Sequence, residues 1–305
     1  MKKALKLIIV AILTFSITTI VHASTYYITG DGVRVRSTPK NADNIIGKLY
    51  YGDIIDVVSL VNKSWYKIKY GSGYGYVSYR YVAKRDDLNV SKTIAIIKNN
   101  TNLKKSNSKS SSNIQSIPKG GAVKVLQEKS GWAYVEYNEN TGYVQTKYLN
   151  KYTNSSELAV GIYTVYYPFN NASRNNNISK SVQKLNKIII KNGKNFSFMK
   201  TIGKNGYSNA PEFEKQGDIY GGGISQVATA LYLASRDAQR NGVHINVTEQ
   251  NRFGSKTPYA KLGEEAMIDL ENNKDLVFVN QSKKAIKIYS NVTGNSVSFA
   301  ISVND

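Results

Sequence analysis

The chain of 305 residues contains no cysteine. It therefore has no disulfide, no thiol nucleophile and no cysteine to which a lipid anchor could be attached. Histidine is scarce too, with two residues in all, and the carboxylates are scattered, so the sequence offers no metal-ligand spacing. We expect neither a metal nor another cofactor. After the N-terminal segment, no hydrophobic run has the length of a membrane span.

The N-terminal segment has the pattern of a secretion signal. Three lysines among the first six residues form a positive end, residues 7–20 are apolar, and residues 21–23 (Val-His-Ala) offer a cleavage site. We expect residues 1–23 to be a signal peptide. The mature protein would then begin near Ser24 and be secreted to the cell wall or cell surface, without stable insertion in the membrane.

Acidic residues are too few to balance the basic ones. The chain has 41 Lys and Arg but 21 Asp and Glu, a formal charge of +20. Outside a cell this charge favours anionic partners such as wall teichoic acid, peptidoglycan carboxylates or lipid head groups. Nucleic acid is the competing partner for so basic a chain, but export argues against it. A Lys-rich codon usage explains part of the excess.

An internal repeat occupies residues 24–152. Its landmarks recur after 67 residues: Trp65, Gly75-Tyr76-Val77 and Tyr81 return as Trp132, Gly142-Tyr143-Val144 and Tyr148. Short alternating runs between Gly, Pro and Asn turns predict strands. We expect two small β-barrels, at residues 24–85 and 90–152, with both tryptophans in their cores and a flexible polar loop at residues 104–113.

The repeat resembles bacterial SH3 domains in its Val-Arg-Val-Arg-Ser segment at residues 33–37, its Trp-Tyr-Lys-Ile segment and its Gly-Tyr-Val triplet. The second copy is a looser match. The resemblance implies that the modules bind wall peptides. A shallow groove of aromatic edges would suit this role, although the same tyrosines could simply cover the barrel faces. The candidate wall-binding residues are Tyr50, Tyr51, Tyr74 and Tyr79.

Later in the chain, three glycines run directly into a helical pattern. Apolar residues recur at helical spacing after Gly223 and predict a helix from about Ile224 to Arg240. Ser225 would lie in its first turn, where unpaired backbone N–H groups and the helix dipole stabilise an anion. Two interpretations are open: Ser225 caps the helix, or it is a nucleophile with oxyanion donors around it.

The sequence GGGISQVATALY at residues 221–232 resembles the signature of the VanW family, whose members carry Cys at the position of Ser225. Further segments at residues 174–178, 192–198 and 275–280 agree, so the resemblance extends from Leu158 to the C-terminus. It implies cell-wall work, including peptidoglycan L,D-transpeptidase activity with the cysteine as nucleophile. The candidate substrate-binding residues on motif positions are Gly221, Gly222, Gly223, Gln226, Arg174 and Tyr259.

The chain departs from the family at three positions. Ser225 replaces the nucleophile, and the register set by Tyr259 places Phe253 at the family's His and Glu265 at its Asp. A serine needs a base within hydrogen-bond reach, and Phe253 cannot supply one. Ser225 and Glu265 are therefore the candidate catalytic residues of a degenerate relative. Other conceivable partners of the serine are Glu249, Asp218 and Lys256.

For residues 158–305 we expect an α+β domain. An apolar face through Ile178, Leu185 and Ile189 predicts a first helix that ends near Asn192-Gly193, and the second helix contains Ser225. Alternation around His244 turns this side chain away from the core. The expected strands are Val243–Thr248, Ala266–Leu270, Leu276–Val279, Ile286–Ser290 and Val297–Val303.

These patterns predict a multidomain chain of two all-β SH3-like barrels followed by an α+β domain. The leading hypothesis is an exported wall protein that binds peptidoglycan through the SH3-like modules and stem peptide through a non-catalytic VanW-like domain. The first alternative is an active L,D-transpeptidase-like or peptidase enzyme that uses Ser225. The second is a wall-targeted adhesin.

Overall fold

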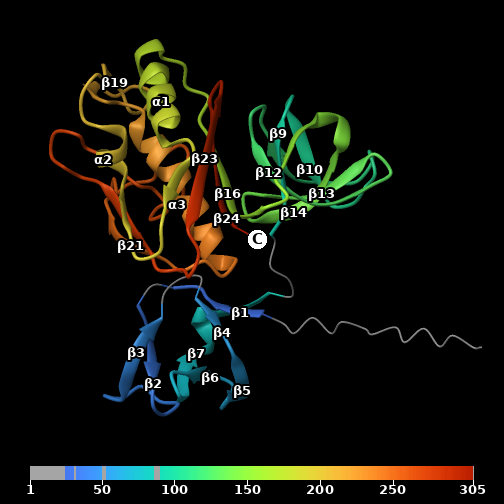
Figure 1. Cartoon of the computed structure of the whole chain (residues 1–305), viewed down its shortest axis with the longest axis vertical. Coiled ribbons are helices and arrows are strands. Elements are labelled where there is room, and N and C mark those ends of the chain that lie inside the picture. Colours follow the sequence, from blue (N-terminus) through green and yellow to red (C-terminus); the bar gives the residue numbers. More distant parts are fainter. Residues whose placement is uncertain (1–24, 31, 50–52, 86–89, 305) are drawn as a thin grey trace, which may run out of the picture.

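The computed structural model describes residues 25–30, 32–49, 53–85 and 90–304. The expected signal peptide, Tyr50 and Tyr51 lie outside these ranges. Within them the chain is mostly β, with few helices and several sheets (Figure 1). No helix in the described ranges is both long and apolar enough to cross a bilayer.

Residues 25–85 form the first module, which has two open sheets in the orders β4-β1-β8 and β3-β2-β7-β6-β5. Asp56 separates β4 from β5, and these two strands belong to different sheets. The strands therefore do not form the expected closed barrel. Its elements are β1 (Thr25–Ile28), β2 (Val33–Arg36), β3 (Ile45–Leu49), β4 (Ile54–Ile55), β5 (Val57–Val61), β6 (Trp65–Tyr70), β7 (Gly73–Ser78), the 3-10 helix η1 (Tyr79–Tyr81) and β8 (Val82–Arg85).

The second module spans residues 90–153 and has one open sheet in the order β11-β10-β14-β13-β12-β9-β15. The repeat is visible in the structure, because β6 and β13 both begin at a tryptophan and the following elements keep the 67-residue offset. The elements are β9 (Thr93–Ile97), β10 (Thr101–Lys104), β11 (Asn113–Ile117), β12 (Ala122–Lys129), β13 (Trp132–Tyr137), β14 (Asn140–Gln145), η2 (Thr146–Tyr148) and β15 (Leu149–Thr153).

The two tryptophans are not core residues. Trp65 and Trp132 are half-buried, and smaller side chains fill the interior of each module, among them Ile68 and Val135. Each tryptophan is the first residue of its strand, next to a turn, and there a large ring remains partly exposed.

The third domain spans residues 157–304 and contains sheets in the orders β16-β24-β23-β17, β18-β22-β21 and β19-β20. Its assignment to the α+β class stays a prediction. The elements are β16 (Glu157–Tyr166), α1 (Ala172–Leu185), β17 (Ile188–Ile190), β18 (Asn195–Ser197), α2 (Phe198–Ile202), β19 (Asn209–Pro211), β20 (Asp218–Tyr220), α3 (Ile224–Arg240), β21 (Ile245–Gln250), β22 (Leu276–Asn280), β23 (Ile286–Thr293) and β24 (Ser296–Asn304).

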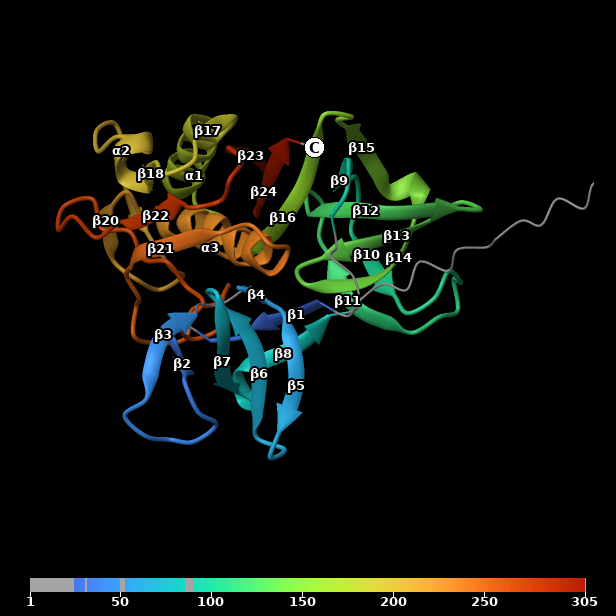
Figure 2. The same ribbon diagram turned by 60° about the horizontal axis from the view of Figure 1, so that its bottom comes forward.

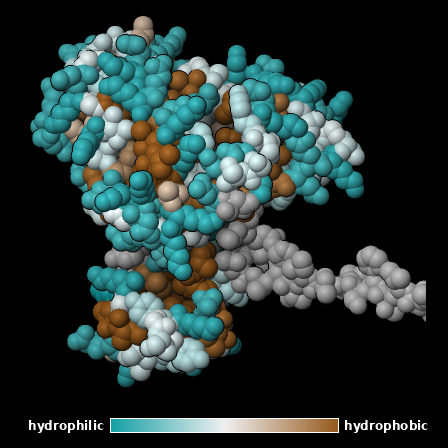
Figure 3. Space-filling model, in the orientation of Figure 1, coloured by the Kyte–Doolittle hydropathy of each residue, from teal (hydrophilic) through white to brown (hydrophobic). Residues whose placement is uncertain are grey.

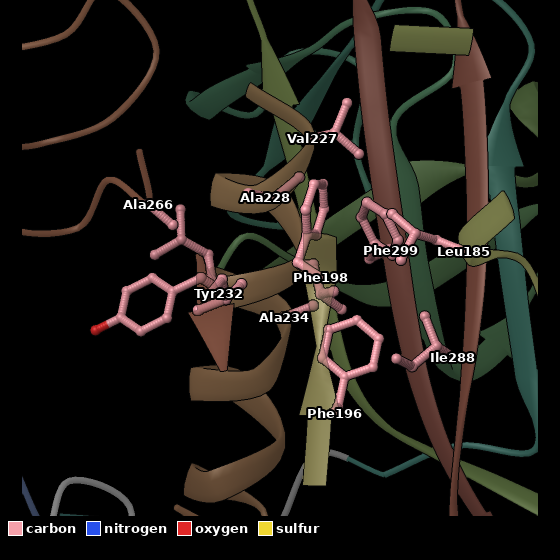
Figure 4. Packing of buried hydrophobic residues seen from close by; sticks show 14 of the residues in the cluster. Leu185, Phe196, Phe198, Val227, Ala228, Tyr232, Ala234, Ala266, Ile288 and Phe299 are labelled. Atoms are coloured by element: carbon pink, nitrogen blue, oxygen red, sulfur yellow. The ribbon is translucent and has the colours of Figure 1, made fainter. Parts of the chain in front are cut away.

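Helix α3 has the predicted bounds and almost every one of its residues is buried. It packs on β16 so closely that a Cβ on Gly161 would lie 2.3 Å from the carbonyl oxygen of Ala234. Figure 4 shows side chains of α3, including Val227 and Tyr232, in one cluster with aromatic rings such as Phe299. The core of the third domain therefore surrounds the helix that carries Ser225.

Two predicted elements of the third domain are wrong. The first helix ends at Leu185, and Ile188–Ile190 forms β17 instead, because its three β-branched residues pair with β23. Residues 266–270 form isolated bridges and no strand; this segment lies along α3. His244 is exposed between buried neighbours, as predicted.

Both faces of the sheet β16-β24-β23-β17 are covered. Alternate residues of β24, including Phe299, pack on the helices, whereas Ser298 and Ala300 face the second module. Figures 1 and 2 both show β16 and β24 on the side of the third domain that adjoins this module. The polar face of an antiparallel strand, which commonly faces water, is buried here against another domain.

Short polar contacts fix this junction. Thr164 and Asn138 exchange two hydrogen bonds of 2.8 Å, and Ser298 donates to the carbonyl of Gly120 at 3.0 Å. A Cβ on Gly120 would lie 2.5 Å from Cβ of Thr293, so only glycine fits there. The second module and the third domain thus form one packed unit.

Candidate functional site

The head of α3 is built by glycine. Gly223 is the N-cap, with φ of 97°, a left-handed conformation that glycine adopts without strain. At Gly222 a Cβ would lie 2.0 Å from the carbonyl oxygen of Ala210. Ser225 lies in the first turn, as predicted, but it is not the N-cap, so the capping interpretation is wrong.

The hydroxyl of Ser225 is committed to the backbone. Its Oγ accepts from the N–H of Ile268 at 3.1 Å and donates to the carbonyl of the same residue at 3.4 Å. One turn later, Thr229 makes the same pair of bonds with Ala266, at 2.9 and 3.4 Å. Ser225 is buried, and its described side-chain hydrogen bonds include no acid or base. Both hydroxyls hold residues 266–268 against the helix.

A carboxylate of the protein itself occupies the anion position at this helix terminus. Glu212 accepts at Oε2 from the N–H of Gly223 at 2.7 Å and at Oε1 from the hydroxyl of Tyr259 at 3.1 Å, and the N–H of Ser225 also donates to it. Burial raises the pKa of Glu212 above its ordinary value, against the opposing effect of Arg174. The site that would stabilise a substrate anion is filled.

Sequence reasoning missed Glu212. It follows the short strand β19 and precedes the glycines by several residues, with no motif spacing of its own. An acidic residue shortly before a glycine-capped helix was the only available indication, and it is common in any sequence.

Arg174 is enclosed as well. Its Nε donates to the carbonyl of Glu212 at 3.1 Å, its terminal nitrogen donates to Oε1 of Gln226 at 2.7 Å, and its guanidinium lies 5.2 Å from the ring of Tyr167 and 5.6 Å from that of Phe169. Burial lowers the pKa of Arg174, partly offset by Glu212. The structure therefore brings the predicted residues Arg174, Gln226 and Tyr259 together, around an internal carboxylate.

Aromatic rings cover this carboxylate. The ring of Phe213 lies 5.1 Å from that of Phe253 and 5.6 Å from that of Tyr259, and Tyr259 is 6.0 Å from Tyr167. Burial, followed by the nearby charge of Glu212, raises the pKa of Tyr259 well above its ordinary value. The hydroxyl of Tyr259 therefore stays protonated and donates to Glu212. Phe253 adds apolar surface at the position where the VanW family has His, the expected base.

The remaining candidate partners of Ser225 are engaged elsewhere or exposed. Glu265 is fully buried; Oε2 accepts from the N–H of Gly263 at 2.5 Å, and Oε1 has no hydrogen-bond partner among the described residues. Glu249 accepts from Asn251 and from the N–H of Asp275. Asp218 and Lys256 are exposed. None of these four side chains has a described hydrogen bond to Ser225.

The wall-binding candidates that the structure describes are on the surface of the first module. Tyr74 is 54% and Tyr79 is 45% exposed, and Nζ of Lys67 lies 4.1 Å from the ring centre of Tyr74. Figure 3 shows apolar patches on this module. Its exposed large aliphatic residues are Ile45, Ile46, Val58 and Leu60.

A cleft lies between the second module and the third domain, distinct from the filled head of α3. It has a volume of about 500 Å³, and its walls include Tyr137 from one side and Tyr163 and Tyr166 from the other. Tyr259, whose hydroxyl contacts Glu212, contributes to its lining as well.

Comparison with known families assigns three segments. Residues 173–302 match the family described as VanW like protein, and residues 31–83 and 99–150 each match the bacterial SH3 domain. The chain therefore contains two bacterial SH3 domains followed by a VanW-like domain. This confirms the family resemblances drawn from the motifs.

Two curated proteins of Bacillus subtilis (strain 168) are similar over part of their length. The chain is 31% identical over 133 residues to the protein named "Putative N-acetylmuramoyl-L-alanine amidase YrvJ", an alignment that covers 40% of this chain and 26% of that protein. It is 28% identical over 134 residues to "Cell wall-binding protein YwsB", covering 41% of this chain and 71% of the relative. The chain thus spans about a quarter of the amidase.

Among solved structures, NlpC2 and NlpC1 of Trichomonas vaginalis align with 92% and 97% of this chain and with 97% of each of their own chains. The sequence identities are 13% and 12%, and the TM-scores are 0.19 and 0.20.

Proposed function

Because two bacterial SH3 domains precede a VanW-like domain in this chain, we propose that the protein is exported, associates with the cell wall and binds peptidoglycan without catalysis. The SH3 domains and the similarity to a cell wall-binding protein support the wall association. The first module, with exposed Tyr74 and Tyr79, provides the main wall contact. Stem peptides and anionic wall polymers are its proposed ligands, the latter through the net charge of +20.

The occupied head of α3 is the observation that carries the non-catalytic part of the proposal. Glu212 accepts from the backbone donors that would otherwise serve an oxyanion, and the hydroxyl of Ser225 is bonded to Ile268. Catalysis by a serine requires a base at hydrogen-bond distance and free oxyanion donors. Among the described residues, no acid or base hydrogen-bonds to the Ser225 hydroxyl, and Phe253 packs on Phe213 where the family has its histidine. The backbone donors already serve Glu212.

The test is incubation of the protein with purified sacculi and with a tetrapeptide donor, followed by mass spectrometry of the crosslinks and of the protein. We expect sedimentation with the sacculi, no new crosslink and no acyl adduct on Ser225. The Ser225→Ala variant should sediment as the wild type does. An adduct at Ser225, absent from Ser225→Ala, would establish the serine enzyme instead.

A gain-of-function pair sharpens this test. Ser225→Cys alone should remain inactive, because acyl transfer also needs an acid and a base, worth about 10²–10⁴-fold in rate. Ser225→Cys with Phe253→His restores both family residues but leaves Glu212 on the oxyanion donors, so we expect at most weak activity. Robust activity of the single variant would show that the filled site does not block catalysis.

A further inference from the structure

We propose that the cleft between the second module and the third domain binds an uncharged N-acetylated glycan strand. This inference rests on the proposed wall association and names the part of the wall that this cleft contacts. Its volume of about 500 Å³ lies within the range of about 300–1,000 Å³ that is usual for small-molecule sites, which often lie between domains.

Apart from Ile117 and Pro118, the lining of the cleft is aromatic, amide and hydroxyl, and it carries no Lys, Arg, Asp, Glu or His. This is unusual in a chain of which 20% of the residues are charged. A stem peptide or a teichoic acid brings carboxylates or phosphates, which an uncharged, partly desolvated lining disfavours. A sugar ring instead presents C–H faces and a rim of hydroxyls. Tyrosine rings offer flat contact surface to the former and hydroxyls to the latter.

Unused hydrogen-bond donors strengthen the assignment. Asn100 accepts at Oδ1 from the N–H of Lys119, and Asn102 accepts at Oδ1 from the hydroxyl of Ser116. Their NH₂ groups and the hydroxyls of Tyr163 and Tyr166 have no hydrogen-bond partner within the described residues. Each amide therefore presents donors, which match the carbonyl oxygen of an N-acetyl group and the ring and hydroxyl oxygens of a sugar.

The cleft is preformed, because both of its walls belong to the same packed unit. Asn138 from one wall and Thr164 from the other, both in the lining, exchange two hydrogen bonds of 2.8 Å. Binding therefore requires little reorganisation of the protein, which lowers the entropic cost of association. Tyr166, which is 45% exposed, is the ring most available to stack on a ligand.

The test is calorimetric and NMR titration of the mature chain with soluble oligomers of N-acetylglucosamine. We expect saturable binding that Tyr166→Ala weakens at least about tenfold, a change equivalent to about 1.4 kcal/mol. Tyr166→Phe keeps the ring and should retain most of the affinity. Asn102→Ala removes a donor and should weaken binding several-fold.

The matched control is Tyr152→Ala, a tyrosine of the second module that is 53% exposed but lies outside this cleft. It should bind the oligomers as the wild type does. Absence of saturable binding, equal losses in the Tyr152 and Tyr166 variants, or competition by a stem peptide would each overturn the proposal. Sedimentation with sacculi measures wall association separately. If the protein sediments with sacculi but does not bind the oligomers, the glycan proposal is refuted and the proposed wall association is not.

Discussion

An ion pair occupies the same cross-strand position in both copies of the repeat. In the first module, Asp56 lies between the core residues Ile55 and Val57 and is 3.7 Å from Lys69, with side chains that are 73% and 67% exposed. Such a pair contributes at most about 1 kcal/mol to stability, because water solvates both charges.

In the second module, Lys124 lies between the core residues Val123 and Val125 and is 3.1 Å from Glu136, so the polarity is reversed. Both side chains are buried. Lys124 also reaches Asp237 of α3 at 2.8 Å.

The network extends further within the third domain. Asp237 accepts from Arg240 at 2.7 Å and from the N–H of Ile162 at 2.8 Å, and Arg240 pairs in turn with Glu139 of the second module at 2.8 Å. The two copies of the repeat therefore use the same position differently. The first module keeps this position in water, whereas the second has become a structural part of the third domain.

Deletions provide the largest expected contrast. Removal of residues 25–85 should leave a chain that still unfolds cooperatively but sediments poorly with peptidoglycan. Removal of residues 25–152 leaves Asp237 without Lys124 and exposes the face of β24 that carries Ser298 and Ala300. We expect this shorter chain to aggregate or to lack a cooperative transition in circular dichroism. A stable isolated third domain would contradict the structural role of the second module.

Single substitutions in the two ion pairs should lower the free energy of unfolding by amounts that differ by several kcal/mol. Lys124→Met leaves the carboxylates of Glu136 and Asp237 buried without their main cation, which typically costs about 3–5 kcal/mol. Lys69→Met, the matched control, should cost at most about 1 kcal/mol. Urea denaturation of both variants measures the difference. Equal effects would mean that the burial of the second pair is energetically unimportant.

A smaller effect is expected from pH. Burial alone would raise the pKa of Asp237, but Lys124 and Arg240 hold it below its ordinary value. A carboxylate with a depressed pKa in the folded state contributes stability above its unfolded pKa of about 3.9, and this contribution is lost as the pH falls through the folded value. Acidification below about pH 4 should therefore weaken the junction.

Melting temperatures of the wild type and of Asp237→Asn, measured from about pH 6 downward, test this. The variant should be less stable at pH 6 but should lose less on acidification. Asp56→Asn serves as control and should follow the wild type. The difference between the curves reports the charge of Asp237 together with its effect on neighbouring Glu139, whose pKa is raised mainly by burial and partly by Asp237. Parallel curves for wild type and Asp237→Asn would refute the assignment.

Much of the fold could be predicted because it depends on local patterns. The apolar spacing in residues 224–240 and the glycines before it define α3, and the 67-residue offset defines the repeat. The helix predicted through Ile188–Ile190 is wrong because the local pattern there is ambiguous: three isoleucines extend a helical face as readily as they form a strand. The pairing of this segment with β23 decided between the two.

What could not be predicted depends on contacts between distant segments. Alternation in β12 indicates that Lys124 faces away from its own core, but it does not indicate that β16 and β24 cover that face or that Asp237 of α3 reaches Lys124 there. Likewise, Glu212 and Tyr259 meet only because their loops converge on the head of α3. Arg174 and Gln226, which were selected from their motif positions, contact each other in the structure, but the carboxylate of Glu212 beside them was not predicted.

The pairing of β16 with β24 has a consequence for the order of folding. Leu158 pairs with Val303, so the central sheet of the third domain closes only after nearly all of that domain has been synthesised. Contacts this distant in sequence form slowly. The second module is complete once residue 153 has been synthesised. Until the third domain has folded, Lys124 and Glu136 stay in water and the face that will form the junction stays uncovered. The nascent chain thus carries an unsatisfied surface for as long as the last strand takes to arrive, which makes this interval the one most exposed to aggregation.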